Sequence, residues 1–421
     1  MASAPRRVIV VGAGIVGVSA GLCLTREGHE VLIVDPRAPG RATSFGNAGS
    51  IAVDSIWPVS TPGAWMQVPR MLLDPAAPLR IRWPYLPRMS PWLFRFLAAG
   101  LPSRVERIAS EIHALNRDAM AAHEALMAEN RINDIVRPTG WLKVYASRAA
   151  FDATAAERAA LKRNGLAAEE LGPDEIRQLE PGLAHHFTRG IFQPANGFVT
   201  QPSALTDAYA EAFVRRSGRI LPERAVRFEF EGNRPVRLVT DLGIHAADCF
   251  VICAGAWSRP LAAMLGSRVP LDTERGYHLN LGLEAGPGLR RPVVVGDHGF
   301  VLAPMRDGLR LTSGVEFAGL AAPPDFRRIY RMLALARKAL PGLGETVSRE
   351  WMGFRPSFPD SKPVLGASPH HDNVFFGFGH GHLGLTLSAR TGQLIADLVA
   401  GRDPGIDLAP YRADRFGGLG A

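Results

Sequence analysis

The chain contains 421 residues with a formal net charge of +8, and 47% of the residues are hydrophobic. This length and composition exclude a disordered or fibrous chain and suffice for two or three domains with sizeable cores. The arginines are spread along the sequence without a basic block, and no zinc-finger, RNA-binding or helix-turn-helix signature accompanies them. The charge therefore favours a compositional bias together with an anionic small substrate or a membrane surface over nucleic acid.

No apolar run approaches the roughly eighteen residues of a membrane span, and residues 1–7 leave no room for a signal peptide before the first apolar strand. Cys23, Cys249 and Cys253 stand in apolar contexts without the spacing of metal ligands. These features predict buried thiols and a cytoplasmic location. We expect no bound metal.

The first elements predicted are a strand over residues 7–12, a helix over 15–27 that Gly28 ends, and a second strand over 30–35. A loop of small residues, 41–51, follows and is suited to lie against a ligand. A strand, a helix and a strand in this order predict the first half of a dinucleotide-binding fold.

The turn between this strand and helix carries three glycines with the spacing of a dinucleotide-binding fingerprint. Gly12 permits a tight turn, Gly14 lets the backbone approach a pyrophosphate, and Gly17 lets the helix pack closely against the strand. The helix N-terminus favours phosphate, and Asp35 is placed to accept hydrogen bonds from ribose hydroxyls. The segment predicts an adenine dinucleotide and leaves NAD and FAD open.

Residues 57–102 mix tryptophans such as Trp65, Trp83 and Trp92 with prolines and arginines, so no long regular element is expected there. Apolar residues at spacings of three and four predict one amphipathic helix over 103–131. The other elements predicted are strands or strand-and-turn segments at 139–145, 190–200, 225–230, 236–239, 249–255 and 373–377, several short antiparallel strands over 271–320, and helices at 152–164, 202–216, 324–340 and 384–400.

This order of elements predicts an α/β chain of two interleaved domains. A Rossmann-like dinucleotide-binding domain is expected from residues 1–56, 198–270 and 346–421. A substrate domain built on an antiparallel sheet is expected from residues 57–197 and 271–345. The continuous apolar run before Ala254 is typical of a buried parallel strand in the first domain.

Three later segments carry residues suited to chemistry. The turn at Ala254 and Gly255 lets backbone run beside a cofactor. The glycine-rich turn that opens the last helix could stabilise negative charge on a reduced flavin, and its His380 and His382 lack a third metal ligand. Arg355, in a proline-stiffened turn before the final strand, is suited to grip a carboxylate through two hydrogen bonds.

Six motifs taken in order resemble the FAD-dependent D-amino-acid dehydrogenase small-subunit family, within the wider glycine oxidase and D-amino-acid oxidase superfamily. They are the fingerprint at 12–17, Thr43-Ser-Phe-Gly-Asn-Ala-Gly49, Ala254-Gly-Ala-Trp257, Arg275-Gly-Tyr277, Gly353-Phe-Arg-Pro356 with Pro359-Asp360, and Gly379-His-Gly-His-Leu-Gly384. The resemblance covers essentially the whole chain and implies non-covalent FAD rather than NAD.

The resemblance also implies roles for single residues. Arg355 matches the family's carboxylate-binding arginine. Phe300 stands where relatives often have a tyrosine that touches the same carboxylate, so Tyr277 or His382 is expected to replace its hydroxyl. The residues implied to contact FAD are Gly12, Gly14, Ile15, Val16, Gly17, Asp35, Pro36, Thr43, Ser44, Asn47, Ala48, Gly49, Ser50, Val226, Ala254, Gly255, Trp257, Gly381, His382, Leu383, Gly384, Leu385 and Thr386.

The activity implied is oxidative deamination of a D-amino acid, or of a cyclic imino acid such as D-proline or D-hydroxyproline, by hydride transfer from Cα to flavin N5. Electrons are expected to pass to a quinone or a partner subunit. A flavin oxidase of the glycine or sarcosine oxidase type and a non-catalytic flavin subunit of a complex stay open as alternatives. Residues 57–97 are interpreted either as a surface that touches an anionic bilayer, at the inner face of the cell membrane, or as a rim over the active site.

Overall fold

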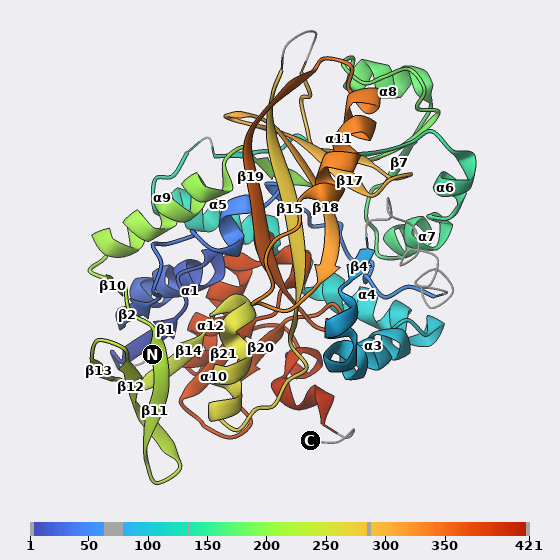
Figure 1. Ribbon diagram of the computed structural model, residues 1–421. Coiled ribbons are helices and arrows are strands. Elements are labelled where there is room, and N and C mark those ends of the chain that lie inside the picture. Colours follow the sequence, from blue (N-terminus) through green and yellow to red (C-terminus); the bar gives the residue numbers. More distant parts are fainter. Residues whose placement is uncertain (1–3, 63–78, 134, 284–287, 418–421) are drawn as a thin grey trace.

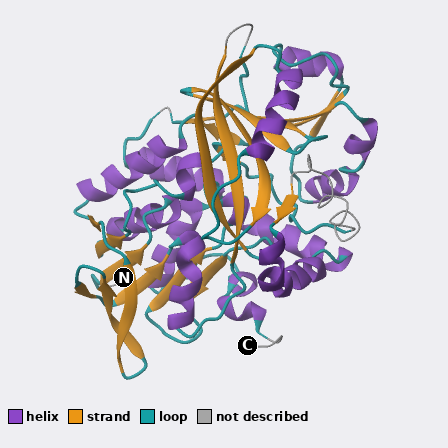
Figure 2. Cartoon of the chain, viewed as in Figure 1, coloured by secondary structure: helices purple, strands orange, loops and turns teal. Residues whose placement is uncertain are grey.

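Figures 1 and 2 show the computed structural model, which describes residues 4–62, 79–133, 135–283 and 288–417. A mainly parallel sheet and a larger mixed sheet form its framework, and helices pack against both. None of the helices in these ranges has the length and apolar character that crossing a membrane requires.

The first sheet has six strands from the beginning, middle and end of the chain. They are β1 (Arg7–Val11), β2 (Glu30–Val34), β10 (Arg219–Leu221), β14 (Cys249–Ile252), β20 (Val364–Ala367) and β21 (Val374–Phe378). Their order is β10, β2, β1, β14, β21, β20, and each neighbouring pair is parallel except β20 with β21. This arrangement confirms the predicted Rossmann-like sheet.

Helices cover both faces of this sheet. They are α1 (Ile15–Arg26), α5 (Ala119–Glu129), α9 (Pro202–Arg215) and α12 (Ser388–Val399) on one face and α10 (Ser258–Met264) on the other. Because successive side chains of a strand point to opposite faces, Val8 and Val10 join the first core while Ile9 and Val11 join the second. Every residue of β14 is buried, which explains its continuous apolar run.

A small antiparallel sheet lies beyond the α10 face. It consists of β11 (Ala225–Glu231), β12 (Arg234–Thr240) and β13 (Ile244–Ala246). Phe228 and Leu238 extend from it into the core of the first sheet. Two of the strands predicted between residues 225 and 255 therefore form this separate sheet, and only β14 enters the parallel one.

The second large sheet has nine strands. They are β4 (Leu79–Ile81), β6 (Trp141–Tyr145), β7 (Glu169–Leu171), β8 (Arg189–Gln193), β15 (Asp272–Leu283), β16 (Val293–Val295), β17 (Phe300–Met305), β18 (Gly308–Phe317) and β19 (Leu343–Ser357). The order is β19, β15, β18, β17, β16, β6, β8, β7, and β4 pairs with β18. Helix α11 (Arg327–Ala339) packs its apolar side chains against this sheet.

The two longest strands, β15 and β19, pair antiparallel from Asp272 opposite Ser357 to Leu283 opposite Leu343. Figure 1 shows both strands reaching from the second sheet down to the helices and strands of the first. The antiparallel character predicted for residues 271–320 is confirmed. The strands are longer than expected, because β15 has 12 residues and β18 has 10.

A small sheet and further helices complete the main regular elements of the described residues. A three-stranded sheet joins β3 (Ser50–Ile51), β9 (Gly197–Val199) and β5 (Val136–Arg137). The other helices are α3 (Leu86–Ala99), α4 (Pro102–Asn116), α6 (Arg148–Asp152), α7 (Ala155–Arg163) and α8 (Pro173–Leu179). The domain boundary predicted at residue 346 falls inside β19, which belongs to the second sheet.

Helix α3 lies where the sequence predicted no long regular element, so that prediction is wrong. Proline usually breaks a helix, but Pro87 stands in the first turn, where proline is tolerated. Pro91 lies inside the helix, and the cost is offset by burial of Trp92, whose ring stacks on Phe96 at a centroid distance of 5.2 Å. Trp65 lies outside the described residues.

The single helix predicted over 103–131 is in fact the two helices α4 and α5. The first ends at Asn116, a fully buried residue whose Nδ2 donates a hydrogen bond to the Ser55 carbonyl at 3.1 Å. The apolar spacing continues across the break because both helices bury one side in the same core. A periodicity of three and four residues therefore indicated the helices and missed the turn between them.

Replacing Gly17 by alanine tests how tightly α1 packs on the first turn. A Cβ at Gly17 would stand 1.9 Å from the Gly12 carbonyl oxygen, a backbone atom, so the helix must move. We expect Gly17→Ala to lower the free energy of unfolding by at least about 1–3 kcal/mol, measured by thermal or urea unfolding. Gly282→Ala is the control, because no atom of the described residues lies within 4 Å of its Cβ position. Equal stability of the two variants would contradict this packing.

Candidate functional site

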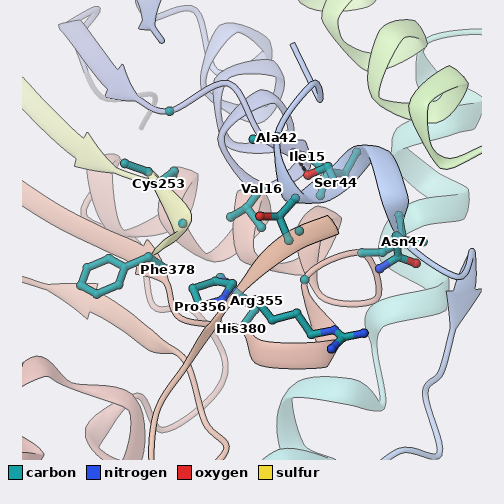
Figure 3. A pocket seen from close by; sticks show the side chains of 18 of the residues that line it. Ile15, Val16, Ala42, Ser44, Asn47, Cys253, Arg355, Pro356, Phe378 and His380 are labelled. Carbon is teal, nitrogen blue, oxygen red and sulfur yellow. Dashed lines mark hydrogen bonds between the residues drawn. The ribbon is translucent and has the colours of Figure 1, made fainter. Parts of the chain in front are cut away.

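A cavity of about 580 Å³ lies where the two large sheets meet. Its lining comes from the turn after β1, the loop from Ala42 to Ser55, the end of β14, strand β19 and residues 377–385. Figure 3 shows Ile15, Val16 and Ser44 on one side of the pocket and Arg355 on another, with the Arg355 side chain extending toward Asn47. One cavity therefore joins the fingerprint glycines to the predicted carboxylate-binding arginine.

The first turn has the geometry expected of the glycine fingerprint. Gly12 has φ +113°, and a Cβ there would stand 2.4 Å from the Cys253 carbonyl oxygen, so only glycine lets β1 and β14 end side by side. Gly14 lines the cavity, and Gly17 packs beneath it. Asp35 lines the same end, where its two carboxylate oxygens accept hydrogen bonds from the backbone N–H groups of Ala13 and Arg37, both at 2.9 Å.

The loop after β2 closes over the start of α1. Thr43–Gly46 form a 3₁₀ turn in which Ser44 Oγ accepts a hydrogen bond from the Ile15 N–H at 3.0 Å. The Thr43 hydroxyl donates to the Phe354 carbonyl on β19 at 2.8 Å. Both ends of this turn are thus fixed, one to α1 and one to the second sheet.

Side chains of the second sheet hold this loop from the other side. Trp351 packs so closely on Gly46 that a Cβ there would lie 2.1 Å from the indole ring. His278 stacks on Trp351 at 5.0 Å, and the buried Arg310 donates to the Asn47 carbonyl at 2.6 Å. Burial lowers the pKa of Arg310 to about 10. The shape of this side of the cavity therefore depends on residues of the second sheet.

The end of β14 forms the opposite wall of the cavity. Gly255 has φ +54°, and residues 255–257 form a 3₁₀ turn. The Arg37 guanidinium lies 4.7 Å from the centre of the Trp257 ring, a cation–π contact. Arg37, Ala254 and Trp257 all line the cavity, as do the neighbouring Arg224 and Ala225. These contacts join the segment after β2 to the turn after β14 at the end of the cavity where Asp35 lies.

The glycine-rich turn after β21 forms the remaining wall. Gly379 and Gly381 have φ +83° and +54°, and the regular helix α12 begins only at Ser388, four residues later than predicted. His380 is buried with Nε2 3.0 Å from the Thr391 hydroxyl, and burial lowers its pKa to about 4. In the part of the chain that is described, no group of three or more His, Cys, Asp and Glu side chains could hold a metal ion.

Arg355 lies within β19 and not in the turn that the sequence predicted. The flanking prolines suggested a turn, but the backbone continues to pair with β15, where Glu274 stands opposite Arg355. Its Nη1 donates to the Gly314 carbonyl at 3.1 Å, and its guanidinium covers Gly276 so closely that a Cβ there would lie 2.3 Å from Cζ. Burial lowers the pKa of Arg355, and Glu274 opposes this shift.

Glu274 is the charged neighbour of Arg355 that sequence reasoning missed. It is only 3% exposed, and its Oε2 accepts a hydrogen bond from His382 Nε2 at 3.0 Å. Burial tends to raise the pKa of Glu274, but the His382 hydrogen bond and the charges of His382 and Arg355 leave it below its ordinary value. Arg355 and His382 thus line the cavity, and the Glu274 carboxylate is buried behind the lining.

Most of the residues predicted to contact a cofactor or substrate line this one cavity. They are Gly12, Gly14, Ile15, Val16, Asp35, Pro36, Thr43, Ser44, Asn47, Ala48, Ser50, Ala254, Gly255, Trp257, Arg355, Gly381, His382, Leu383, Gly384 and Leu385. Gly17, Gly49 and Thr386 lie just behind the lining, where the Thr386 hydroxyl accepts a hydrogen bond from the Ala52 N–H at 3.0 Å. Val226 exposes its side chain on β11, one residue beyond the lining.

Two residues predicted to serve the substrate do not line the cavity. Tyr277 follows Gly276 on β15 and so points to the other face, where its hydroxyl donates to Glu316 at 2.5 Å. Phe300 is fully buried in the core beneath α11. Neither side chain touches the space around Arg355, so the carboxylate contact expected of Tyr277 has no support in this placement.

Several lining residues were not singled out from the sequence. Trp141, Val301, Thr312 and Trp351 come from four strands of the second sheet, which also carries Arg355, and contribute mainly apolar side chains to the lining. Alternation along 139–145 indicated that Trp141 faces one side of a sheet, but not which side holds a ligand. Only the register between distant strands settles that.

Comparison with known proteins agrees with this site. Residues 7–398 match the family model described as FAD dependent oxidoreductase. A D-amino-acid oxidase of Bradyrhizobium diazoefficiens is 37% identical over 419 residues, covering 98% of this chain and 99% of that protein. A D-amino acid dehydrogenase of Paramagnetospirillum magneticum is 32% identical, with coverages of 97% and 99%. The glycine oxidase structure from Geobacillus kaustophilus has the same fold, with a TM-score of 0.78 at 22% identity over 98% of this chain and 100% of that one.

Proposed function

Because this chain belongs to the FAD-dependent oxidoreductase family, we propose that it oxidises D-amino acids by loss of hydride from Cα. The observation that carries the proposal is the position of Arg355, whose guanidinium lies in the same cavity as the fingerprint glycines. The names of the relatives from Bradyrhizobium and Paramagnetospirillum, a D-amino-acid oxidase and a D-amino acid dehydrogenase, support the choice of substrate.

The residues present fit FAD. The Gly12 turn has no room for a Cβ, Gly14 lines the cavity beside it, and a volume of about 580 Å³ is typical of a cofactor site. In the proposed arrangement Asp35, Arg37 and Trp257 hold the adenosine half, and Ser44, Asn47 and the 381–385 turn hold the half that bears the ring. When bound, FAD supplies the acceptor for the hydride.

The residues of the chain itself bind and orient the substrate in this proposal. Arg355 grips the carboxylate, and Gly276 leaves the flat space in which the guanidinium lies. Trp141, Val301 and Trp351 offer an apolar wall to the side chain, which favours neutral substrates, including a cyclic imino acid such as D-proline. Positioning then supplies much of the catalysis, because the reacting atoms are held in one geometry.

The electron acceptor distinguishes two forms of this function. We favour a dehydrogenase that passes electrons to a quinone or a partner protein. The oxidase name of the Bradyrhizobium relative supports the alternative, in which oxygen is reduced to hydrogen peroxide. A peroxide assay in air, compared with reduction of a dye under nitrogen, separates the two. A chain whose flavin no amino acid reduces would instead support a non-catalytic flavin subunit.

Arg355→Leu tests the proposed substrate grip. We expect the variant to retain FAD and to raise the KM for a neutral D-amino acid by about tenfold to a hundredfold, because a charge-assisted hydrogen bond contributes about 1.5–3 kcal/mol. Steady-state kinetics with an artificial dye and the flavin-to-protein absorbance ratio measure both quantities. Arg349→Leu, at a position on the same strand that is absent from the cavity lining, is the matched control. A KM for Arg355→Leu close to that of the unmodified protein would contradict the assignment.

A surface on and before α3 supports contact with an anionic membrane as part of this proposal. Trp83, Pro87, Pro91 and Phe94 recur at spacings of three and four residues and are all exposed, Trp83 by 66% and Phe94 by 71%. The exposed Arg88 accompanies them. A row of apolar side chains with a nearby cation is suited to the interface of an anionic bilayer, where a quinone is available.

Vesicle binding tests this surface. We expect Trp83→Ala with Phe94→Ala to weaken sedimentation with anionic vesicles by at least about tenfold, because burial of each large apolar side chain stabilises binding by about 1.5–3 kcal/mol. Trp92 is not used because it is buried. Leu242→Ala with Ile244→Ala, which removes apolar side chains exposed elsewhere, is the control. Equal binding by both double variants, or binding that salt does not weaken, would refute the membrane contact.

A further inference from the structure

The pair formed by His382 and Glu274 takes no part in the carboxylate grip proposed for Arg355. His382 lines the cavity with 42% of its side chain exposed, whereas the Glu274 carboxylate is almost fully buried behind it. The two belong to segments 108 residues apart, which the β15–β19 pairing and the turn after β21 bring together. A buried carboxylate that orients a cavity-facing histidine is an arrangement suited to proton transfer.

The hydrogen bond to Glu274 settles which nitrogen of His382 is free. An ionised carboxylate only accepts hydrogen bonds, so the proton in the 3.0 Å contact belongs to His382 Nε2. In the neutral imidazole the lone pair is then on Nδ1. Glu274 therefore orients the ring and stabilises the positive charge that forms when Nδ1 takes a proton.

The proposed reaction requires such a proton acceptor. A free amino acid carries an ammonium group, and its nitrogen needs a lone pair to form the C=N bond as hydride leaves Cα. When Arg355 binds the carboxylate, the amine nitrogen is held nearby, because it is only two bonds from the carboxylate carbon. Among the other titratable groups of the lining, Asp35 accepts two backbone hydrogen bonds at the distant end, His380 is buried against Thr391, and burial raises the pKa of the Cys253 thiol.

We propose that His382 takes the proton from the substrate ammonium and that Glu274 is its positioning residue. The N–H bond of the ammonium breaks, a bond between that proton and Nδ1 forms, and the nitrogen keeps the electron pair. That pair forms the C=N bond while the Cα hydrogen leaves as hydride to FAD, the acceptor in the proposed function on which this inference rests. The product is an iminium ion that water later hydrolyses.

The charges around His382 come from three elements. Glu274 on β15 stabilises the protonated ring, Arg355 on β19 opposes it, and His380 lies in the same turn as His382. Removing the negative charge while retaining the size of residue 274 therefore favours the neutral ring. Glu274→Gln is expected to make proton uptake by His382 less favourable, and Glu350→Gln, an exposed change on β19, is expected to leave it unchanged.

The experiment combines NMR titration of the His382 ring in the FAD-bound protein with the pH dependence of kcat/KM for a neutral D-amino acid. We expect the acidic limb of kcat/KM to follow the NMR titration and to move with it in Glu274→Gln. In His382→Gln that limb should vanish, kcat/KM at neutral pH should fall by about a hundredfold or more, and activity should keep rising with pH until the substrate amine itself is neutral.

A limb that stays in place in Glu274→Gln, or an unaltered profile in His382→Gln, would overturn this inference. Bound FAD and thermal stability, measured for each variant, separate these results from misfolding. The proposed function fails on a different result, an unchanged KM in Arg355→Leu. If Arg355→Leu behaves as expected and the acidic limb does not move, only the role of His382 and Glu274 is refuted.

Discussion

The antiparallel pairing of β15 with β19 is the interaction on which the site depends. It sets Glu274 opposite Arg355, holds the Arg355 guanidinium over Gly276, and brings Trp351 against Gly46 of the loop that closes the cofactor side. Because register fixes which face each side chain takes, a slip of one residue would turn all of these groups away from the cavity. The length of the pairing, from Asp272 to Leu283, makes such a slip costly.

The cavity results from two sheets with different tasks. The parallel sheet ends its strands β1 and β14 at glycine turns, where the backbone can approach a dinucleotide at the switch between strands. The antiparallel sheet contributes side chains from several strands, which can be charged or apolar as the substrate requires. In the proposed function, the cofactor is therefore recognised mainly by backbone geometry, and the substrate by the chemistry of side chains such as Arg355 and Trp141.

Local patterns were sufficient to predict the parts of the molecule whose structure is itself local. The fingerprint, α1 and the apolar β14 follow from glycine spacing and hydrophobic runs, and the resemblance found Arg355 as a candidate. Prolines near Arg355 favoured the prediction of a turn where the structure has a strand. Other prolines, in residues 57–102, concealed α3. Glu274 could not be found from local patterns. Its importance comes from strand pairing opposite Arg355, 81 residues later, and from the hydrogen bond with His382, still farther along the chain.

Anaerobic titration of the FAD-bound protein with the D and L forms of one neutral amino acid tests the central claim most directly. The flavin absorbance reports hydride loss from Cα before any electron acceptor takes part, so the result does not depend on whether the enzyme is an oxidase or a dehydrogenase. We predict that the D form bleaches the flavin while the L form leaves it oxidised. Bleaching by the L form alone, or by no amino acid in a panel that includes D-proline, would contradict it.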